Sequence, residues 1–213
     1  ENDALAFARA MPTAIAYALR PEATALVLEP RGGLEVWIAL AGSAEEVLAV
    51  VPNPLVVEAV GRLYDHPSVT LVQSDARSFA ERQTGHYDVV ALALTDPYRP
   101  VRSGAYGLNE DYTYTIEAFD DYVGALAPDG ILVLNRWLQN PPSESLRVWG
   151  LILTALEDHN LPPASHAVAF RGYQTMTFLV KRQPFTDEEM TRIRAFADDR
   201  AFDLVMAPDL NAE

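Results

Sequence analysis

The residues best placed to do chemistry follow a short apolar strand near the N-terminus, which runs into a turn at residues 29–33. A turn that binds a nucleotide-like cofactor has glycine at positions 29, 31 and 33, because its backbone must bend tightly and approach the ligand with no Cβ in the way. This sequence has Glu29 and Arg31 there and keeps Gly33. Gly32 adds a second glycine at the start of a helix, where an anionic group is favoured. The turn therefore predicts a cofactor site with altered chemistry.

The loops after the second and third strands carry fewer of the expected groups. Nucleoside-binding folds usually end the second strand in an acid that holds the ribose, and this position is Val51, followed by Asn53. Glu29 is a nearby substitute for that acid. In the third loop, Asp75-Ala76 places a carboxylate where it would accept a hydrogen bond from an adenine amino group. Asp75 is equally suited to cap the helix that follows, so both interpretations stay open.

The loop after the fourth strand is the richest in functional groups. It is about twenty residues long, and loops of that length in compact domains are often binding loops or lids. It carries Asp96 and the tyrosines Tyr98, Tyr106 and Tyr114, which would position a substrate or, in the alternative, cover the end of the sheet. At the end of the fifth strand, Arg136 either faces the same cleft or caps the sheet edge as an exposed residue.

The elements that must position these residues alternate between apolar, β-rich runs and helical periods. This pattern is typical of a mostly parallel sheet covered by helices on both faces. Strands are predicted at about 24–29, 46–51, 69–73, 87–94 and 130–136, and helices near 33–42, 53–63, 76–83, 115–126 and 143–158. The ligand of such a sheet lies at the carboxyl ends of the central strands, where the strand order reverses. The four loops would therefore meet at one edge.

Two further strand-like runs, 164–170 and 174–181, are joined by only three residues, which predicts an antiparallel hairpin. The predicted fold class is therefore α/β: a doubly wound, mostly parallel seven-stranded sheet with an antiparallel C-terminal hairpin. This methyltransferase-like plan would occupy residues 1–181, with residues 1–20 forming a leading helix.

Residues 182–213 are predicted to extend the same domain. Thr186 would cap a helix at 187–199, and a short strand would follow at 202–206.

Composition narrows the range of partners. The 213 residues include 16 basic and 30 acidic side chains, and the net charge of −14 argues against a nucleic-acid partner, because phosphate binding needs basic surface. An acidic surface suits a cationic substrate such as a polyamine, or simply favours solubility. Cysteine is absent and the four histidines show no metal-ligand spacing, so no metal site is predicted. The longest apolar stretch, residues 4–19, is interrupted by Arg9 and Pro12, so no direct membrane insertion by this chain is predicted.

Several short motifs follow one another in a characteristic order. They are Tyr87-Asp88-Val89-Val90, Asp96-Pro97, Gly104-Ala105-Tyr106, residues 114–119 and Pro128-Asp129-Gly130-Ile131-Leu132. In this order and spacing they resemble the spermidine synthase-like branch of the class I S-adenosylmethionine-dependent transferase superfamily. The resemblance covers roughly residues 14–181 and is closest to versions that occur as soluble modules of larger bacterial membrane proteins.

The resemblance implies a cofactor, S-adenosylmethionine or decarboxylated S-adenosylmethionine, and no metal. It assigns cofactor contacts to Asn53, Asp75 and Ala76, and the turn itself adds Glu29, Gly32 and Gly33 as candidate cofactor contacts. Asp96 matches an acid that helps to hold the polyamine and is the best candidate for a catalytic residue, with Tyr98, Tyr106 and Tyr114 as substrate contacts.

This sequence departs from the family's pattern at the position of the catalytic base. An aminopropyltransferase of this type has an aspartate that takes a proton from the attacking amine, and this sequence has Ala93 there. General-base help is worth roughly 10²–10⁴-fold in rate, so the methyl group argues against ordinary spermidine synthesis.

Two functions of different classes stay open. The first is a transferase with a degenerate S-adenosylmethionine-type site that takes a small-molecule ligand. The second is a non-catalytic binding or scaffold module, a pseudoenzyme, within a larger membrane-associated protein. A nicotinamide dehydrogenase ranks third, because it too needs an acid at the end of the second strand.

Location and assembly follow from the same hypotheses. We expect a cytoplasmic protein, or a cytosol-facing module if the parent protein has a membrane part. An exposed apolar leading helix would indicate a partner or a homodimer, whereas a leading helix packed on its own sheet would count against this.

Overall fold

The computed structural model describes residues 6–94 and 112–210, which fold into helices around one sheet. The helices are α1 (Ala6–Arg9), α2 (Ala14–Leu19), α3 (Leu34–Ala41), α4 (Pro54–Val60), η1 (Gly61–Asp65, a 3-10 helix), α5 (Ala76–Ala80), α6 (Ile116–Ala125), α7 (Ser143–Asp158), α8 (Pro163–His166) and α9 (Asp187–Asp199). The strands are β1 (Thr24–Leu28), β2 (Glu46–Val50), β3 (Val69–Val72), β4 (Tyr87–Leu92), β5 (Leu126–Trp137), β6 (Ala167–Arg171), β7 (Thr175–Lys181) and β8 (Asp203–Met206).

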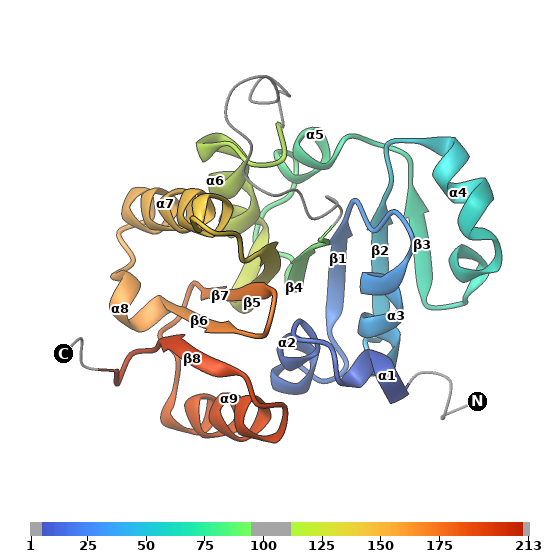
Figure 1. Ribbon diagram of the computed structural model, residues 1–213. Helices are drawn as coiled ribbons and strands as arrows, with labels where there is room; N and C mark the ends of the chain where they lie inside the picture. The colour runs from blue at the N-terminus through green and yellow to red at the C-terminus, as the bar shows by residue number, and fades with distance from the viewer. Residues whose placement is uncertain (1–5, 95–111, 211–213) are drawn as a thin grey trace.

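The sheet has the order β3-β2-β1-β4-β5-β7-β6-β8 and runs from β3 on the right of Figure 1 to β8 at the lower left. Neighbouring strands from β3 to β5 are parallel, and β7 and β6 form the antiparallel hairpin. The predicted α/β, doubly wound class is therefore confirmed. The sheet has eight strands rather than seven, because β8 also joins it, antiparallel to β6.

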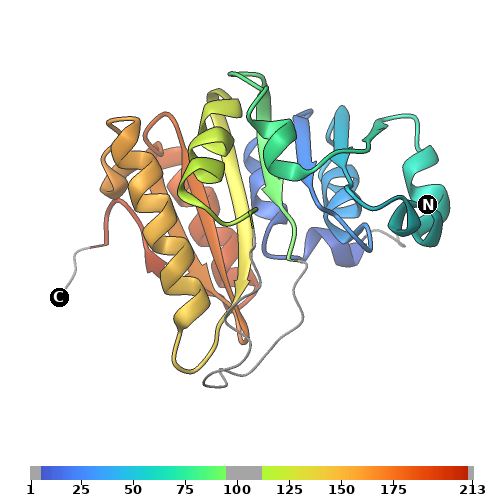
Figure 2. The same cartoon turned by 90° about the horizontal axis from the view of Figure 1, so that it is seen from above.

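Helices cover both faces of the sheet, as Figure 2 shows from above. Side chains of a strand alternate between its two faces, so Val27 packs on one side of β1 and Leu28 on the other. The first face is covered by α2, α3 and α9, and the second by α5, α6 and α7. The two faces hold separate apolar clusters, which is the plan expected of a parallel sheet buried on both sides.

The predicted leading helix is broken. Among the described residues it consists of α1 and α2, separated by a turn around Pro12, because a proline disfavours helical backbone in the residue before it. Ile15, Tyr17 and Leu19 of α2 are buried in the first cluster. The leading segment therefore packs on its own sheet, which removes the expected argument for an exposed helix there. Within residues 6–94 and 112–210, no helix is long and apolar enough to span a membrane.

Two predicted elements are divided in the structure. The run 164–170 begins as α8 and becomes strand only at Ala167, because Pro163 has the backbone angle of a first helical residue. The predicted helix 53–63 divides into α4 and η1 at Gly61, whose φ is +66°. The second division places η1 against the turn at residues 29–33, which is called the cofactor turn below.

A buried ion-pair network fixes the C-terminal helix to the rest of the fold. Lys181, fully buried at the end of β7, contacts both carboxylate oxygens of Glu189 at 2.7 and 2.8 Å and Asp129 at 2.8 Å. Arg20 contacts the same two acids, each at 2.7 Å. Glu189 also closes the capping box of α9 with Thr186, which confirms the predicted helix start. Burial disfavours its charged form, but the hydrogen bonds from Lys181, Thr186 and Arg20 outweigh this and lower its pKa.

Candidate functional site

Those predicted site residues that the structure describes follow the carboxyl ends of the parallel strands, at the top of Figure 1. Leu28 of β1 is paired with Val50 of β2 and with Leu92 of β4. The next residue of each strand therefore lies in one row across this edge: Val51, Glu29 and Ala93. The Glu29 N–H donates to Val50 O at 2.9 Å, and the Ala93 N–H donates to Leu28 O at 3.3 Å. Glu29, at the centre of this row, is therefore its one acid. In the resembling family the acids would stand at the two outer positions, which here are Val51 and Ala93.

The turn has the backbone of a glycine turn although two of its three glycine positions hold Glu29 and Arg31. Its φ angles are +49° at Glu29, +38° at Arg31 and +82° at Gly33, so all three positions that a cofactor turn reserves for glycine are left-handed. A left-handed conformation costs a residue with a Cβ about 1–2 kcal/mol. Such strain persists only where the surrounding structure imposes it.

Contacts around the turn show what imposes its shape. A Cβ on Gly33 would lie 2.2 Å from Leu63 Cδ2, so a side chain there would displace the buried Leu63 of η1, and the φ of +82° favours glycine in any case. The Gly33 N–H donates to Pro30 O at 2.7 Å, which closes the turn. Gly32 is exposed, and a Cβ there would meet no atom within 4 Å. Of the two glycines, Gly32 is therefore the one that leaves backbone open to a ligand.

Relief of this strain should stabilise the protein. We expect Glu29→Gly and Arg31→Gly each to raise the free energy of unfolding by about 0.5–1 kcal/mol, because the relieved strain exceeds the extra chain entropy of glycine. The measurement is urea denaturation. Glu58→Gly, at an exposed helical position of α4, is the matched control and should lose about 1 kcal/mol. A loss of stability at position 31 as large as at position 58 would contradict the prediction.

Asp75 and Asn53 both cap helices. Asp75 Oδ1 accepts a hydrogen bond from the Ser78 N–H at 3.0 Å, and Asn53 Oδ1 accepts one from the Leu55 N–H at 3.0 Å. Asp75 remains exposed, while Ala76 is fully buried. The capping alternative for Asp75 is therefore confirmed, and contacts of Asn53, Asp75 and Ala76 with a cofactor stay predictions.

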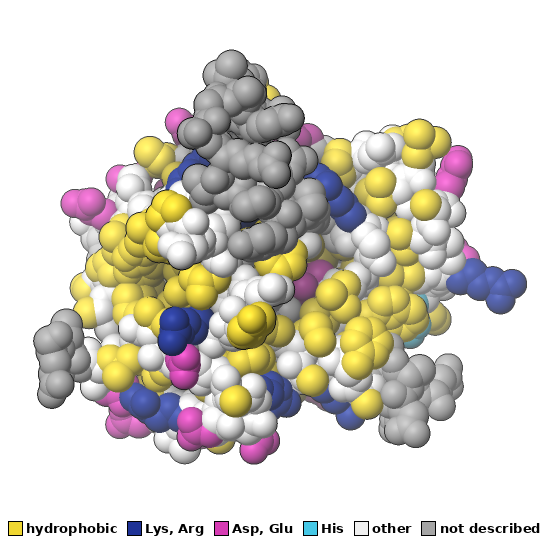
Figure 3. Space-filling view, viewed as in Figure 1, with side chains coloured by type: hydrophobic (Ala, Val, Ile, Leu, Met, Phe, Trp, Pro, Cys, Tyr) yellow, Lys and Arg dark blue, Asp and Glu magenta, His cyan; other side chains and the backbone are white. Residues whose placement is uncertain are grey.

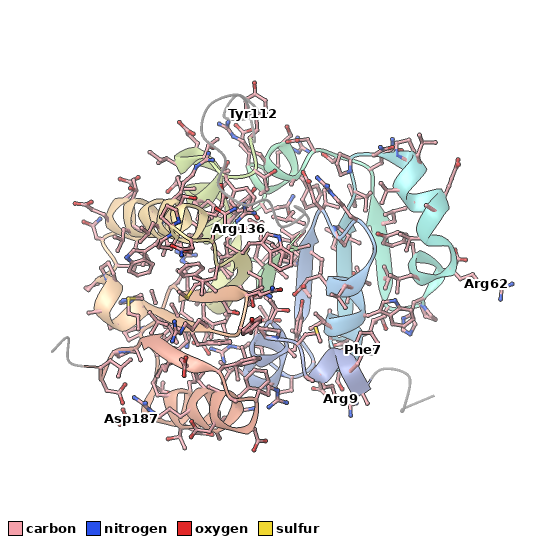
Figure 4. All side chains as sticks on the ribbon, viewed as in Figure 1. Phe7, Arg9, Arg62, Tyr112, Arg136 and Asp187 are labelled. Atoms are coloured by element: carbon pink, nitrogen blue, oxygen red, sulfur yellow. The ribbon has the colours of Figure 1, made fainter. Side chains whose placement is uncertain are left out.

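A buried cluster closes the site on the side of β5. The guanidinium of Arg136 lies 4.2 Å above the centre of the Tyr114 ring and pairs with Glu144 at 2.5 Å. Arg136 is 4% exposed, so its interpretation as an exposed cap of the sheet edge is wrong. Figure 4 shows it at the centre of the molecule, below the exposed Tyr112. Sequence reasoning missed the partner, Glu144, although an acid in the first turn of a helix is a usual place for one.

Tyr114 belongs to the core as much as to the site. It is 5% exposed, packs against Phe119 at 6.2 Å between ring centres, and its carbonyl accepts a hydrogen bond from Arg147 at 3.1 Å. Its predicted contact with substrate stays a prediction.

Asp96, Tyr98 and Tyr106 lie outside the described residues. Just after that segment, Thr113 Oγ1 donates to Glu29 Oε1 at 3.4 Å, which ties the end of the long loop to the cofactor turn. No pattern in the sequence predicted this contact. In the part of the chain that the structure describes, no group of three or more His, Asp or Glu side chains is arranged to hold a metal ion.

Several solved structures share the fold of this chain. A probable spermidine synthase from Corynebacterium glutamicum matches 91% of this chain and 70% of its own with a TM-score of 0.66 and 16% sequence identity. The fold is that of the class I S-adenosylmethionine-dependent transferases. Spermidine synthase from Thermotoga maritima also has this fold, with a TM-score of 0.58 and 14% identity over 87% of this chain and 62% of its own.

A third structure with this transferase fold is a spermidine synthase in complex with the transition-state analogue AdoDATO, with a TM-score of 0.56 and 12% identity. It matches 90% of this chain and 65% of its own. This chain thus spans a little under two thirds of the spermidine synthases in these last two comparisons. No protein-family model and no curated protein matches the sequence.

Proposed function

We propose that the chain binds an S-adenosylmethionine-type nucleoside at the carboxyl edge of its sheet and transfers an alkyl group from it to a small acceptor. The observation that carries the proposal is the cofactor turn, which is left-handed at Glu29, Arg31 and Gly33 although only the last is glycine. Four other described non-glycine residues have positive φ angles, namely Glu22, Ser43, Asn160 and Ala201. Of the six, only Glu29 and Arg31 lie in the turn at the carboxyl end of β1, where a parallel sheet binds its ligand. The spermidine synthase with bound AdoDATO supports the choice of cofactor.

The residues present fit such a cofactor, except that the acid at this edge is Glu29 on β1's turn and not a residue at position 93. Gly32 offers open backbone beside the turn, and the exposed carboxylate of Asp75 has one oxygen outside the capping hydrogen bond to accept from an adenine amino group. Glu29 stands between the two positions, 51 and 93, that lack their acids. Its carboxylate is half-buried and would take over the role of the acid that is missing at position 93.

The chemistry would depend mainly on alignment. S-adenosylmethionine or its decarboxylated form supplies an activated methyl or aminopropyl carbon when bound. An amine acceptor attacks only after it has lost a proton, and Glu29 is the acid of the described residues that lies next to Ala93, the position of the missing base. Asp96, Tyr98 and Tyr106 would hold the acceptor from the long loop, as the resemblance implies. Most of the rate would come from holding acceptor and reacting carbon together.

A non-catalytic binding module is the second candidate. It is favoured by Ala93, which presents a methyl group where a base would stand and is itself 7% exposed. In that case the edge would bind a nucleoside without transfer, and the fold would serve a larger parent protein as a scaffold.

Calorimetric titration with S-adenosylmethionine, its decarboxylated form and S-adenosylhomocysteine tests the proposal. We expect micromolar binding of at least one of them. Asp75→Ser should lose at least about tenfold in affinity but little stability, because serine is also a good helix cap, whereas Asp75→Ala should lose about 1 kcal/mol as well. Unchanged affinity in Asp75→Ser would limit Asp75 to its capping role.

Glu29→Gln separates the two candidates. A transferase should lose roughly 10²-fold or more in turnover with an amine acceptor while the cofactor still binds. If none of the three nucleosides binds at millimolar concentration, both the transferase and the nucleoside-binding module are excluded, and the fold is a scaffold.

A further inference from the structure

Helix α4 has an apolar sequence but no buried side chain. Six of the seven residues of Pro-Leu-Val-Val-Glu-Ala-Val are apolar, yet none is buried, and Leu55 is 67% exposed. Helices on the surface of a globular protein usually bury their apolar stripe and expose a polar face. Val56, Val57 and Val60 are half-buried against the core, so the exposed apolar surface of α4 consists of Pro54, Leu55 and Ala59, and such a surface beside a groove indicates an interface.

A groove of about 750 Å³ runs between α4–η1 and α3, and it extends this apolar surface. Trp37, Leu55, Val56, Val60 and Leu63 are among its lining residues. Leu34 and Phe7, 45% and 51% exposed, continue the apolar surface over α3 and α1. Figure 3 shows hydrophobic side chains gathered over α1 and α3, and Figure 4 shows Phe7 beside them and Arg62 pointing outward at the edge.

Both acidic and basic side chains lie on the surface around this groove. Arg31 and Arg62 are among the lining residues, none of which is acidic, although the chain as a whole has a net charge of −14. Glu58 is exposed on α4, and Arg62 lies four residues later in η1, beyond the break at Gly61. A surface that binds an unrelated acidic partner needs only the arginines. A surface that binds its own copy needs both signs, because in a two-fold interface each residue meets the same patch of the partner.

We propose that the occupant of this groove is a second copy of the chain, bound through a two-fold contact of α4 against α4. Leu55 of each copy would fill the groove of the other, and Glu58 would meet Arg62 of the second copy. Burial of Leu55 and its apolar neighbours would supply most of the free energy, and the two ion pairs would set the register. Arg31 and Gly32 of the cofactor turn also line this groove, so the second copy would reach the end of the carboxyl edge at that turn.

Sedimentation velocity of the chain from about 1 to about 200 µM tests this, a range that brackets weak and ordinary homodimers. We expect a dimer with a micromolar dissociation constant. Leu55→Glu should weaken it at least about thirtyfold, because it places an unpaired charge in the groove. Leu146→Glu is the matched control: Leu146 is 62% exposed on α7, on the other face of the sheet, and should change nothing.

Charge exchange tests the register. Glu58→Arg and Arg62→Glu should each weaken the dimer by about tenfold, because each places like charges opposite one another, and the double variant should restore it. A chain that stays monomeric at the highest concentration overturns the proposal. So does a dimer that Leu55→Glu leaves intact, or one that the double variant fails to restore.

Discussion

Replacement of Lys181 with methionine is expected to lower the free energy of unfolding by about 3 kcal/mol or more, because removal of one member of a buried ion pair leaves the other without compensation. Lys181 is fully buried and contacts Glu189 and Asp129 at 2.7–2.8 Å. Asp129 is 64% exposed and regains water, so most of the loss arises at Glu189, which keeps only Arg20 as a charged partner.

Urea denaturation measures this loss, and two comparisons define it. Arg171→Met removes an exposed pair with Asp203, in which the side chains are 52% and 67% exposed, and should cost less than about 1 kcal/mol. The double variant Lys181→Met, Glu189→Gln should recover part of the loss, because it removes the buried charge that the single variant strands. A single variant as stable as the Arg171 variant would mean that the network contributes nothing to stability.

Replacement of Glu35 with glutamine is expected to stabilise the protein by about 3 kcal/mol at pH 8 and by less than about 1 kcal/mol at pH 5. Burial raises the pKa of Glu35 from 4.5 to about 7, and the nearby Thr13 hydroxyl opposes the shift only in part. Among the described residues, neither Glu35 Oε1 nor Thr13 Oγ1 has a hydrogen-bond partner of ordinary geometry. Tyr17 is also buried nearby, and its pKa is raised by burial and by the charge of Glu35. The ionised carboxylate therefore gains little in the fold.

The direction of the pH dependence follows from this raised pKa. The folded protein holds the Glu35 proton more tightly than the unfolded chain, so this contribution to stability is complete below pH 4.5 and is lost as the pH rises through about 7. Glutamine cannot ionise, so the difference in stability between the variant and the parent protein should grow over that interval. Thermal denaturation of both proteins from pH 5 to pH 8 measures it, with Glu157→Gln at an exposed position of α7 as the control. A difference that does not change with pH would show that Glu35 is ionised throughout.

The order of the main strands and helices along the chain was predictable, because each of them has a local signal in the sequence. The bounds of α7 and α9 agree with the prediction, since both show a regular apolar period and α9 begins at Thr186, whose capping box is complete. The hairpin of β6 and β7 followed from its short connection.

Features that depend on distant residues could not be predicted in this way. Lys181 and Glu189 are close in sequence, but Arg20 and Asp129 reach them only through the sheet order. Arg136 looked like a surface residue because the sequence does not show that Tyr114 and α7 enclose it. The carboxyl edge was predicted, whereas the left-handed backbone at Glu29 and Arg31 was not, because neither residue type favours it.

Single substitutions would be enough to place glycine at positions 29 and 31 of the cofactor turn. Glu29 and Arg31 already have φ angles that glycine adopts freely, so a glycine at either position would need no new loop conformation. The strand ends differ, because Val51 and Ala93 are 1% and 7% exposed, and an acid placed there would lose its water before it gained a partner. Glycine could therefore be introduced at positions 29 and 31 one at a time and in either order, whereas an acid at position 51 or 93 would need a ligand or a base that pairs with it.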